Sequence, residues 1–234
     1  MKKSNIATLI VFLLLIPLTL FLGTKMSGRS NYLIGTLIIV ELMIPFFMAF
    51  EGRKPQAREL VVIAVMCALA IAGRVVIPIP NFKAAYAIIM LAGIAFGPEA
   101  GFLVGAITAF ASNFFYGQGP FTPWQMFGYG AGGMLAGFCF RENWLPRKNW
   151  VMAIFGFVTV LLWVGPLLDC SHIFLVLPKI SWTAVIATFI SGFYVNVSQA
   201  TCTSLVMLLL GNPLLEKLDR VKLKYGMMED ENGI

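Results

Sequence analysis

The chain has 234 residues, of which 59% are hydrophobic and only 12% are charged, and its formal net charge is +6 at pH 7. Soluble domains carry about 25% charged residues, so this composition excludes a soluble globular protein and predicts an integral, polytopic membrane protein. The excess of positive charge is then expected to contact anionic lipid at the inner leaflet, not nucleic acid.

Eight apolar stretches approach the length needed to cross about 30 Å of hydrocarbon. Only helices and closed barrels satisfy all backbone polar groups in lipid, and the chain lacks the sustained alternating strands of a barrel. All-α spans are therefore predicted at residues 6–23, 31–50, 59–78, 84–97, 100–116, 123–140, 150–170 and 182–211. Only Gly97-Pro98-Glu99 separates the short fourth and fifth stretches, so whether residues 84–116 form two full crossings stays open.

Composition divides the chain into an N-terminal part and a core. Residues 1–50 are predicted to form a transmembrane hairpin, and residues 51–58 a charged cytoplasmic linker. Residues 59–211 are rich in glycine and alanine and are predicted to form a six-helix core. Residues 212–234 form a basic and then acidic cytoplasmic tail.

The N-terminal hairpin has two notable features. Its first span follows Lys2 and Lys3, but no small-residue cleavage site comes after it, so it is interpreted as an uncleaved signal-anchor. Glu41, inside the second span, is costly in lipid and should face protein. It either has a functional role or makes a buried hydrogen bond to a neighbouring helix.

The distribution of Lys and Arg predicts the orientation. With the N-terminus inside, twelve of these 17 residues fall in cytoplasmic segments and five lie outside or at the outer rim. The five are Lys25, Arg29, Arg74, Lys83 and Lys179. Both termini are thus predicted to be cytoplasmic. The segments 77–83, 117–125 and 169–181 then share the outer face.

The segment Gly117–Gln125 combines rigidity with polar and aromatic groups. Its two glycines permit tight turns, and its two prolines stiffen the backbone and remove N–H donors. Gln118, Thr122, Trp124 and Gln125 add hydrogen-bonding groups and a flat ring. The segment is predicted to be an outer hairpin that faces a ligand, although a packed connection between helices could have the same composition.

Small residues recur at helical spacing in three of the core spans, where they would let helix backbones approach closely. The stripes are Ala64, Ala68 and Ala72 in the third span, Gly101, Gly105 and Ala109 in the fifth, and Gly128 and Gly132 beside Gly133 and Gly137 in the sixth. Internal packing explains the fifth and sixth spans. For the alanine stripe, internal packing and contact with another protein both stay open.

Four segments in order carry a family resemblance: AREL at residues 57–60, PIPNFK at 78–83, AGIAFGPEAG at 92–101 and GQGPFTPWQM at 117–126. This succession resembles the substrate-binding S components of energy-coupling factor (ECF) vitamin transporters, over residues 57–211. The resemblance implies a six-helix core that holds a vitamin near the outer surface. It also implies partnership with a transmembrane T subunit and two cytoplasmic ATPases.

The same resemblance assigns T-subunit docking to Ala64, Ala68 and Ala72, which match the alanine-spaced motif of the family. The extra hairpin at residues 1–50 departs from the family pattern, and its role is open. Members directed to cobalamin or another corrinoid make such a compound a candidate substrate.

The residues themselves favour a binding subunit that a partner energises. The chain contains no phosphate-binding loop of the G-x-x-x-x-G-K-[ST] type, so it is not expected to hydrolyse ATP. Ionisable groups within the spans are few, whereas a proton- or sodium-coupled carrier usually needs a relay of them. A stand-alone secondary transporter and a non-transporting scaffold remain the alternatives.

An enzyme is not expected. His172 is the only histidine, and nothing places it opposite a nucleophile. No metal or cofactor is predicted, and Cys67, Cys139, Cys170 and Cys202 have no paired spacing.

An outward substrate pocket is predicted from polar and aromatic residues near the outer helix ends, with Asn196 added on the strength of the resemblance alone. Its residues are Asn81, Lys83, Asn113, Tyr116, Gln118, Trp124, Gln125 and Asn196. The aromatic rings could stack on a flat ligand. Arg74, Lys83 and Lys179 would suit a carboxylate, phosphate or amide-rich ligand.

Overall fold

The computed structural model describes residues 10–24, 30–52, 56–141, 143–176 and 181–224, and all regular elements in these ranges are helical. They are a π-helical turn (Val11–Leu15), α2 (Ile16–Thr24), α3 (Ser30–Gly52), α4 (Ala57–Val75), α5 (Ala85–Phe96), α6 (Pro98–Tyr116), α7 (Thr122–Arg141), α8 (Asn149–Thr159), a second π-helical turn (Val160–Val164), α9 (Gly165–Val176) and α10 (Trp182–Lys224). The described parts of the predicted spans are helical except at residues 76–78, at Ala84 and at Gly97. Lys2, Lys3, Lys25, Arg29, Arg53, Lys54, Lys179 and the tail beyond residue 224 lie outside the described residues.

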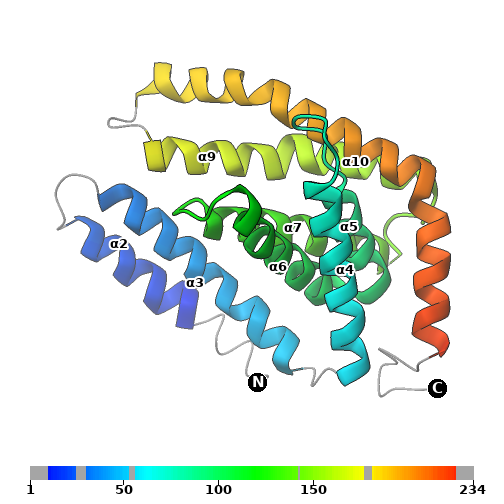
Figure 1. The fold of residues 1–234 in the computed structure, drawn as a ribbon. Helices are drawn as coiled ribbons and strands as arrows, with labels where there is room; N and C mark the ends of the chain where they lie inside the picture. Colours follow the sequence, from blue (N-terminus) through cyan, green and yellow to red (C-terminus); the bar gives the residue numbers. More distant parts are fainter. Residues whose placement is uncertain (1–9, 25–29, 53–55, 142, 177–180, 225–234) are drawn as a thin grey trace.

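The protein is an all-α polytopic membrane protein, as predicted. In the described part of the chain, Leu33–Gly52, Asn149–Leu175 and Trp182–Lys224 are long and apolar enough to cross a membrane, and Ala85–Phe96 is a shorter apolar helix. Figure 1 shows α2 and α3 along one edge of the molecule and α9 and α10 along the opposite edge, with α5, α6 and α7 between them.

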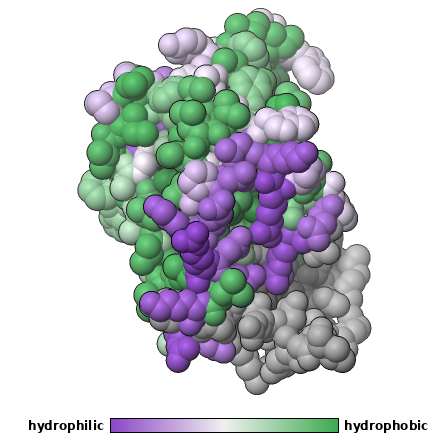
Figure 2. Space-filling view, turned by 90° about the vertical axis from the view of Figure 1, so that its right-hand side faces the viewer, coloured by the Kyte–Doolittle hydropathy of each residue, from purple (hydrophilic) through white to green (hydrophobic). Residues whose placement is uncertain are grey.

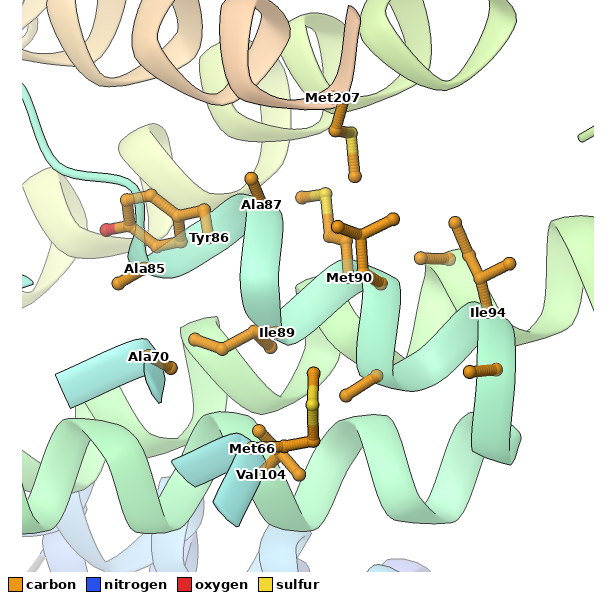
Figure 3. Packing of buried hydrophobic residues seen from close by; sticks show 14 of the residues in the cluster. Met66, Ala70, Ala85, Tyr86, Ala87, Ile89, Met90, Ile94, Val104 and Met207 are labelled. Carbon is orange, nitrogen blue, oxygen red and sulfur yellow. The ribbon is translucent and has the colours of Figure 1, made fainter. Parts of the chain in front are cut away.

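The short helix α5 is the centre of the core. Eleven of its twelve residues are buried, and α4, α6, α7, α8 and α10 all contact it. Figure 3 shows its side chains between Met66 and Ala70 of α4, Val104 of α6 and Met207 of α10. The helix α5 rises only about 18 Å over its twelve residues, which is less than the roughly 30 Å of the hydrocarbon core.

Close backbone contact holds α5, α6 and α7 together. A Cβ atom at Gly101 would lie 2.5 Å from the carbonyl oxygen of Gly133 and 2.7 Å from the Cα of Gly93. Only glycine permits three helices to approach this closely at one crossing. The glycine stripes predicted in the fifth and sixth spans are therefore internal packing.

A sharp turn joins α5 to α6. Gly97 has φ +99°, a conformation that favours glycine, and Pro98 follows as the first residue of α6. Arg141 and Arg147 donate hydrogen bonds to the carbonyls of Phe96 (3.5 Å) and Ile94 (3.2 Å) at the end of α5. These cations satisfy carbonyls that the helix leaves free and complement its dipole.

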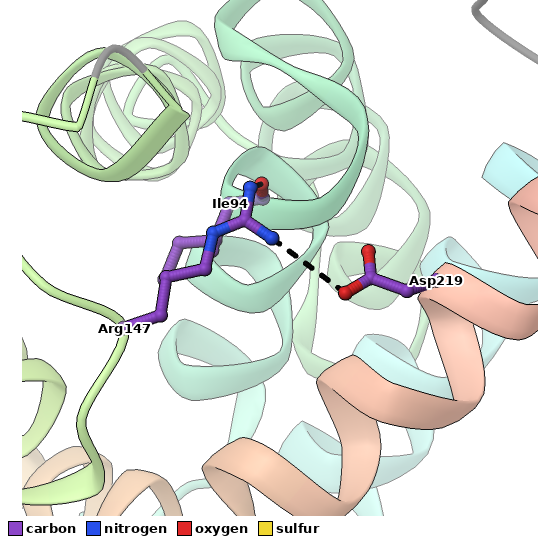
Figure 4. A network of polar contacts seen from close by, with 3 residues as sticks. All are labelled: Ile94, Arg147 and Asp219. Atoms are coloured by element: carbon purple, nitrogen blue, oxygen red, sulfur yellow. Dashed lines mark hydrogen bonds and ion pairs between the residues drawn. The ribbon is translucent and has the colours of Figure 1, made fainter.

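The helix α10 continues beyond the predicted end of the last span at residue 211 and reaches Lys224. It is bent along its length (Figure 1), and Pro213 lies inside the helix. Leu215 is buried beyond it, and Asp219 forms an ion pair with Arg147 at 3.6 Å (Figure 4). The apolar face of these turns thus packs on the core.

The other side of these turns is polar. Lys217, Arg220 and Lys224 are exposed there. Figure 2, which faces the side where α10 ends, shows hydrophilic residues gathered low on the molecule and apolar residues above them. This end of the bundle is the one that also carries Arg141 and Arg147.

The hairpin of α2 and α3 packs on the core through a second apolar cluster. Phe46 of α3 stacks on Phe102 of α6, with 4.5 Å between ring centroids. Within the hairpin, Thr19 donates a hydrogen bond of 2.5 Å to Glu41. Glu41 is therefore bonded to a neighbouring helix, in agreement with the simpler of its two interpretations.

Candidate functional site

A polar cluster joins the ends of α4, α6 and α7. We call it the Arg74 cluster, and it consists of Arg74, Ser112, Asn113, Tyr116, Gln118, Thr122 and Gln125. It lies next to the connection 117–121, which was predicted as part of a ligand-facing hairpin.

Asn113 is the hub of the Arg74 cluster. It is fully buried, its Oδ1 accepts a hydrogen bond from Nη1 of Arg74 (2.9 Å) and its Nδ2 donates to Oε1 of Gln125 (2.8 Å) and Oγ1 of Thr122 (3.1 Å). Nη1 of Arg74 also donates to Oγ of Ser112. The buried amide of Asn113, on α6, is thus bonded to α4 through Arg74 and to α7 through Thr122 and Gln125. These bonds hold the three helices at a fixed spacing.

The connection from α6 to α7 comprises residues 117–121, close to the gap between the predicted spans 100–116 and 123–140. Thr122, Pro123, Trp124 and Gln125 form the first turn of α7 instead of a hairpin, where proline needs no N–H donor. The Thr122 hydroxyl accepts a bond from the N–H of Gly119 (3.2 Å) and donates to Oε1 of Gln118 (2.9 Å). The loop is therefore folded onto the start of α7, and the exposed Gln118 is held in place.

Two tyrosine rings flank the Arg74 guanidinium. Its central carbon lies 5.0 Å from the centroid of the Tyr116 ring and 5.3 Å from that of Tyr129. The Tyr116 hydroxyl donates a hydrogen bond of 2.8 Å to the backbone carbonyl of Arg74, although the ring itself is half exposed. Cation–π attraction and this bond orient the guanidinium.

Trp124 lies apart from the Arg74 cluster. Only 5% of its surface is exposed, and its ring stacks on Phe174 of α9 with 5.6 Å between centroids. Its Nε1 donates a 3.4 Å bond to Thr36 of α3, and a Cβ at Gly35 would lie 3.0 Å from the ring. The side chain thus joins the N-terminal hairpin to α7 and α9.

Asn196 forms a separate polar pair inside the bundle. Its Nδ2 donates a 2.8 Å hydrogen bond to Oδ2 of Asp169, and Asn196 itself is buried. Gly165 lies against Asn196 and Gly192 against Asp169, so a Cβ at either glycine would overlap the facing polar group. Residues 169–176 of the predicted outer segment 169–181 are helical and continue α9, so they do not form a loop.

The loop between α4 and α5 carries the remaining predicted residues. Lys83 donates a 2.7 Å hydrogen bond to the carbonyl of Ile77, and Asn81 has φ +59°. Ala84, at the end of this loop, donates its N–H to the carbonyl of Gly73 (3.0 Å). The loop therefore folds back on itself beside the end of α4.

The structure thus brings together four of the eight predicted pocket residues: Asn113, Tyr116, Gln118 and Gln125. Arg74 organises this group, yet it was treated only as a source of positive charge. A signal was available, because Arg74 is the only charged residue between Glu59 and the end of α4. Ser112, Tyr129, Asp169 and Phe174 were not predicted as site residues, and Thr122 was predicted only as a hydrogen-bonding residue of the segment 117–125.

The alanine stripe of α4 does not pack inside the protein. Ala64, Ala68 and Ala72 are all exposed in the isolated chain, and Val65 and Leu69 between them are 52% and 50% exposed. The stripe therefore forms a smooth apolar surface, unlike the buried glycines of α6 and α7.

The comparisons with known proteins give one positive finding. A family model described as "ECF-type riboflavin transporter, S component" matches residues 54–217, which is more than half of the chain. No curated protein and no solved structure matches the chain. The match agrees with the S-component resemblance of the sequence and does not confirm the corrinoid-directed subtype. The chain belongs to the S-component family of ECF-type riboflavin transporters, and is therefore a membrane-embedded substrate-binding subunit of an ECF transporter and not an enzyme.

Proposed function

We propose that this chain captures riboflavin, or a closely related flavin, at the outer face of the cell membrane and delivers it for ATP-driven uptake with a T subunit and two ATPases. The observation that carries this proposal is the family match over residues 54–217. It favours a flavin over the corrinoid considered from the sequence.

The chemistry of the Arg74 cluster supports a flavin ligand. A flavin presents a flat ring system edged with carbonyl and imide groups. The half-exposed Tyr116 ring offers a stacking surface, and the amides of Gln118 and Gln125 can pair with such edges. The guanidinium of Arg74 adds a donor aimed by two rings.

The proposed substrate pocket keeps the residues predicted from the sequence, and their surroundings support different roles for them. Tyr116 and Gln118 are exposed and can contact ligand directly. Asn113 and Trp124 are buried and are proposed to act by holding α6 and α7 in position. The full set is Asn81, Lys83, Asn113, Tyr116, Gln118, Trp124, Gln125 and Asn196.

We further propose that the T subunit docks on Ala64, Ala68 and Ala72. A stripe that presents only methyl groups allows a partner helix to approach the α4 backbone closely. Its exposure in the isolated chain supports contact with another protein.

The proposed orientation places both termini in the cytoplasm and the Arg74 cluster outside. The basic residues around the end of α10 and the connection after α7 support it, because cations prefer the cytoplasmic side. Labelling of single-cysteine variants in intact cells tests it, with the native cysteines replaced. A membrane-impermeant reagent should modify Lys83→Cys and spare Arg147→Cys, and the reverse pattern would reject the orientation.

Binding and transport are tested separately with the purified full chain. Titration of riboflavin, followed by the quenching of flavin fluorescence, should give saturable binding, and cobalamin should not compete. Proteoliposomes containing this chain alone should show no uptake under a proton or sodium gradient. Uptake should appear only with the T subunit, the ATPases and ATP. Gradient-driven uptake by the chain alone would favour the secondary-transporter alternative.

A further inference from the structure

The helix α10 is longer than a membrane crossing requires, and its charged residues all lie at one end. Its 43 residues rise about 64 Å, whereas the hydrocarbon core is roughly 30 Å thick. Residues 182–215 contain no charged side chain, and six of the nine residues 216–224 are charged. The last turns of α10 therefore lie outside the hydrocarbon, at the level of the lipid headgroups or beyond it.

One side of these last turns is packed on the core, and another side is cationic. Leu215 is buried in the core cluster. Lys217, Arg220 and Lys224 are exposed, and their i, i+3, i+7 spacing places them on one face of the helix. We call these three residues the basic face of α10.

The carboxylates of the same turns are directed away from the basic face. Asp219, the neighbour of Arg220 in the sequence, forms an ion pair with Arg147 (3.6 Å, Figure 4). Glu216 is exposed and lies about 100° around the helix axis from Lys217. The basic face therefore keeps an excess of positive charge, which complements an anionic surface.

Two exposed tryptophans lie at the same level as these turns. Trp150 follows Asn149, whose Oδ1 accepts a 2.8 Å hydrogen bond from the N–H of Asn212 in α10. Trp144 lies in the connection that Arg147 ties to the end of α10. Trp144 and Trp150 are 73% and 58% exposed. Tryptophans gather at the headgroup level of membranes, where an apolar ring and a polar N–H are both accommodated. An acidic protein surface would account for the cations but not for these two rings.

We propose that the basic face of α10 binds the headgroups of anionic phospholipids, and that Trp144 and Trp150 insert into the same headgroup layer. The last turns of α10 then lie on the membrane surface. The bend of α10 permits this, because its end does not have to follow the direction of the part that crosses the membrane (Figure 1). Basic helical segments with an apolar side bind anionic bilayers in this way. The inference is independent of the flavin assignment, and it locates on one helix face a contact that net charge alone predicts only for the chain as a whole.

The test compares the full-length protein in nanodiscs of phosphatidylcholine with and without phosphatidylglycerol. The readout is amide hydrogen exchange over residues 214–224, because contact with headgroups stabilises the helical state of these turns. In wild type, phosphatidylglycerol should slow this exchange about fivefold or more, and added salt should reduce the difference. In the double variant Lys217→Gln/Arg220→Gln, exchange in the two lipids should be nearly equal. Equal exchange in wild type, or a difference that survives in the double variant, would overturn the proposal.

Glu216→Gln is the matched control. It changes an exposed neighbour of Lys217 to the same amide, but it removes a negative charge instead of a positive one. It should preserve or increase the effect of phosphatidylglycerol. A loss of the effect as large as that in the double variant would mean that the readout follows helix stability and not charge, and the basic face would lose its support.

The same face could also take a soluble anion. Inorganic phosphate is therefore added to phosphatidylcholine nanodiscs, with sodium chloride at the same ionic strength as the reference. Phosphate should not reproduce the protection given by phosphatidylglycerol. If it does, the face is a site for soluble anions, and the lipid assignment is overturned.

A protein partner is the remaining occupant to exclude. The double variant, in phosphatidylcholine, should still co-purify with the T subunit and the ATPases, because the basic face is assigned to lipid. Loss of co-purification in the double variant but not in Glu216→Gln would assign the face to a protein partner instead.

Discussion

Adding one methyl group at Gly133 should separate α6 from α7, whereas the same change at the neighbouring Gly132 should not. A Cβ at Gly133 would lie 2.8 Å from both the carbonyl carbon of Gly101 and Cγ2 of Ile89, and it would overlap the Gly101 carbonyl oxygen. A Cβ at Gly132 would meet only side chains, at 3.3 Å from Cγ2 of Val164 and farther from the others.

These distances set the expected magnitudes. Relief at Gly133 requires the helices to part by roughly 0.6 Å or more, and a gap of this size forfeits about a quarter of the dispersion energy across the interface. Overpacking of this kind costs about 1–3 kcal/mol. Gly132→Ala instead gains up to about 1 kcal/mol of helix propensity, less a small adjustment of Val164. The two variants should thus differ by about 2 kcal/mol or more.

Thermal unfolding of the purified protein, followed by circular dichroism of the helices, measures this difference. A gap of 2 kcal/mol corresponds to about 4–8 °C for a chain of this size. Gly133→Ala should also weaken flavin binding, because the Asn113–Gln125 bond spans the same two helices. Equal midpoints for the two variants, or a lower midpoint for Gly132→Ala, would refute the idea that backbone contact at this crossing fixes the bundle.

Three other changes test separate parts of the molecule. Ala68→Trp should block co-purification with the T subunit and leave flavin binding intact, and the opposite pattern would assign the stripe to the ligand site. Trp124→Ala should lower the free energy of unfolding by about 3–5 kcal/mol and speed proteolysis of the N-terminal hairpin. Trp124→Phe keeps an aromatic ring in place, so both effects should be much smaller. Arg147→Met should speed amide hydrogen exchange over residues 214–224. The expected loss of stability is only about 0.2–1 kcal/mol, because the ion pair with Asp219 is partly exposed. Asp219→Asn should have the same effect, and unchanged exchange in both would show that apolar packing alone holds the end of α10.

The helices could be predicted from the sequence because the hydrophobicity of a membrane span is the sum of the contributions of its own residues. Runs of apolar residues near the length of a bilayer identify spans whatever their neighbours are. Even the shortness of α5 was visible, since Gly97 and Pro98 end its apolar run. The deep burial of α5 could not be predicted in the same way. It depends on glycines of α6 and α7, which let these two helices pack closely against α5.

The predicted boundaries failed where polar residues continue a helix. Asp169 looked like the start of an outer loop, yet Asn196 on α10 satisfies its carboxylate and α9 continues to Val176. The last span was predicted to end at residue 211, but the helix continues past Pro213, and Leu215 beyond it is buried against the core. In each case the decisive partner lies far away in the sequence, so a local pattern cannot reveal it.

The predicted pocket shows the same limit at the level of single side chains. Composition identified Trp124 and Gln125 together, as adjacent residues in one rigid segment. In the structure these two residues belong to the first turn of α7, and adjacent side chains of a helix point in different directions. Gln125 bonds to Asn113 in the Arg74 cluster, and Trp124 turns toward Thr36 and Phe174. A change of loop into helix thus divided one predicted site into two environments.

That division gives the N-terminal hairpin a defined place, although it lies outside the family match at residues 54–217. The hairpin packs on α6, α7 and α9, and it reaches the start of α7 through Trp124. The alanine stripe is on α4 and stays exposed. A hairpin on the alanine face would compete with the T subunit, whereas the observed position leaves that face open. The extra helices can therefore brace the end of α7 beside the Arg74 cluster without obstructing the proposed docking surface.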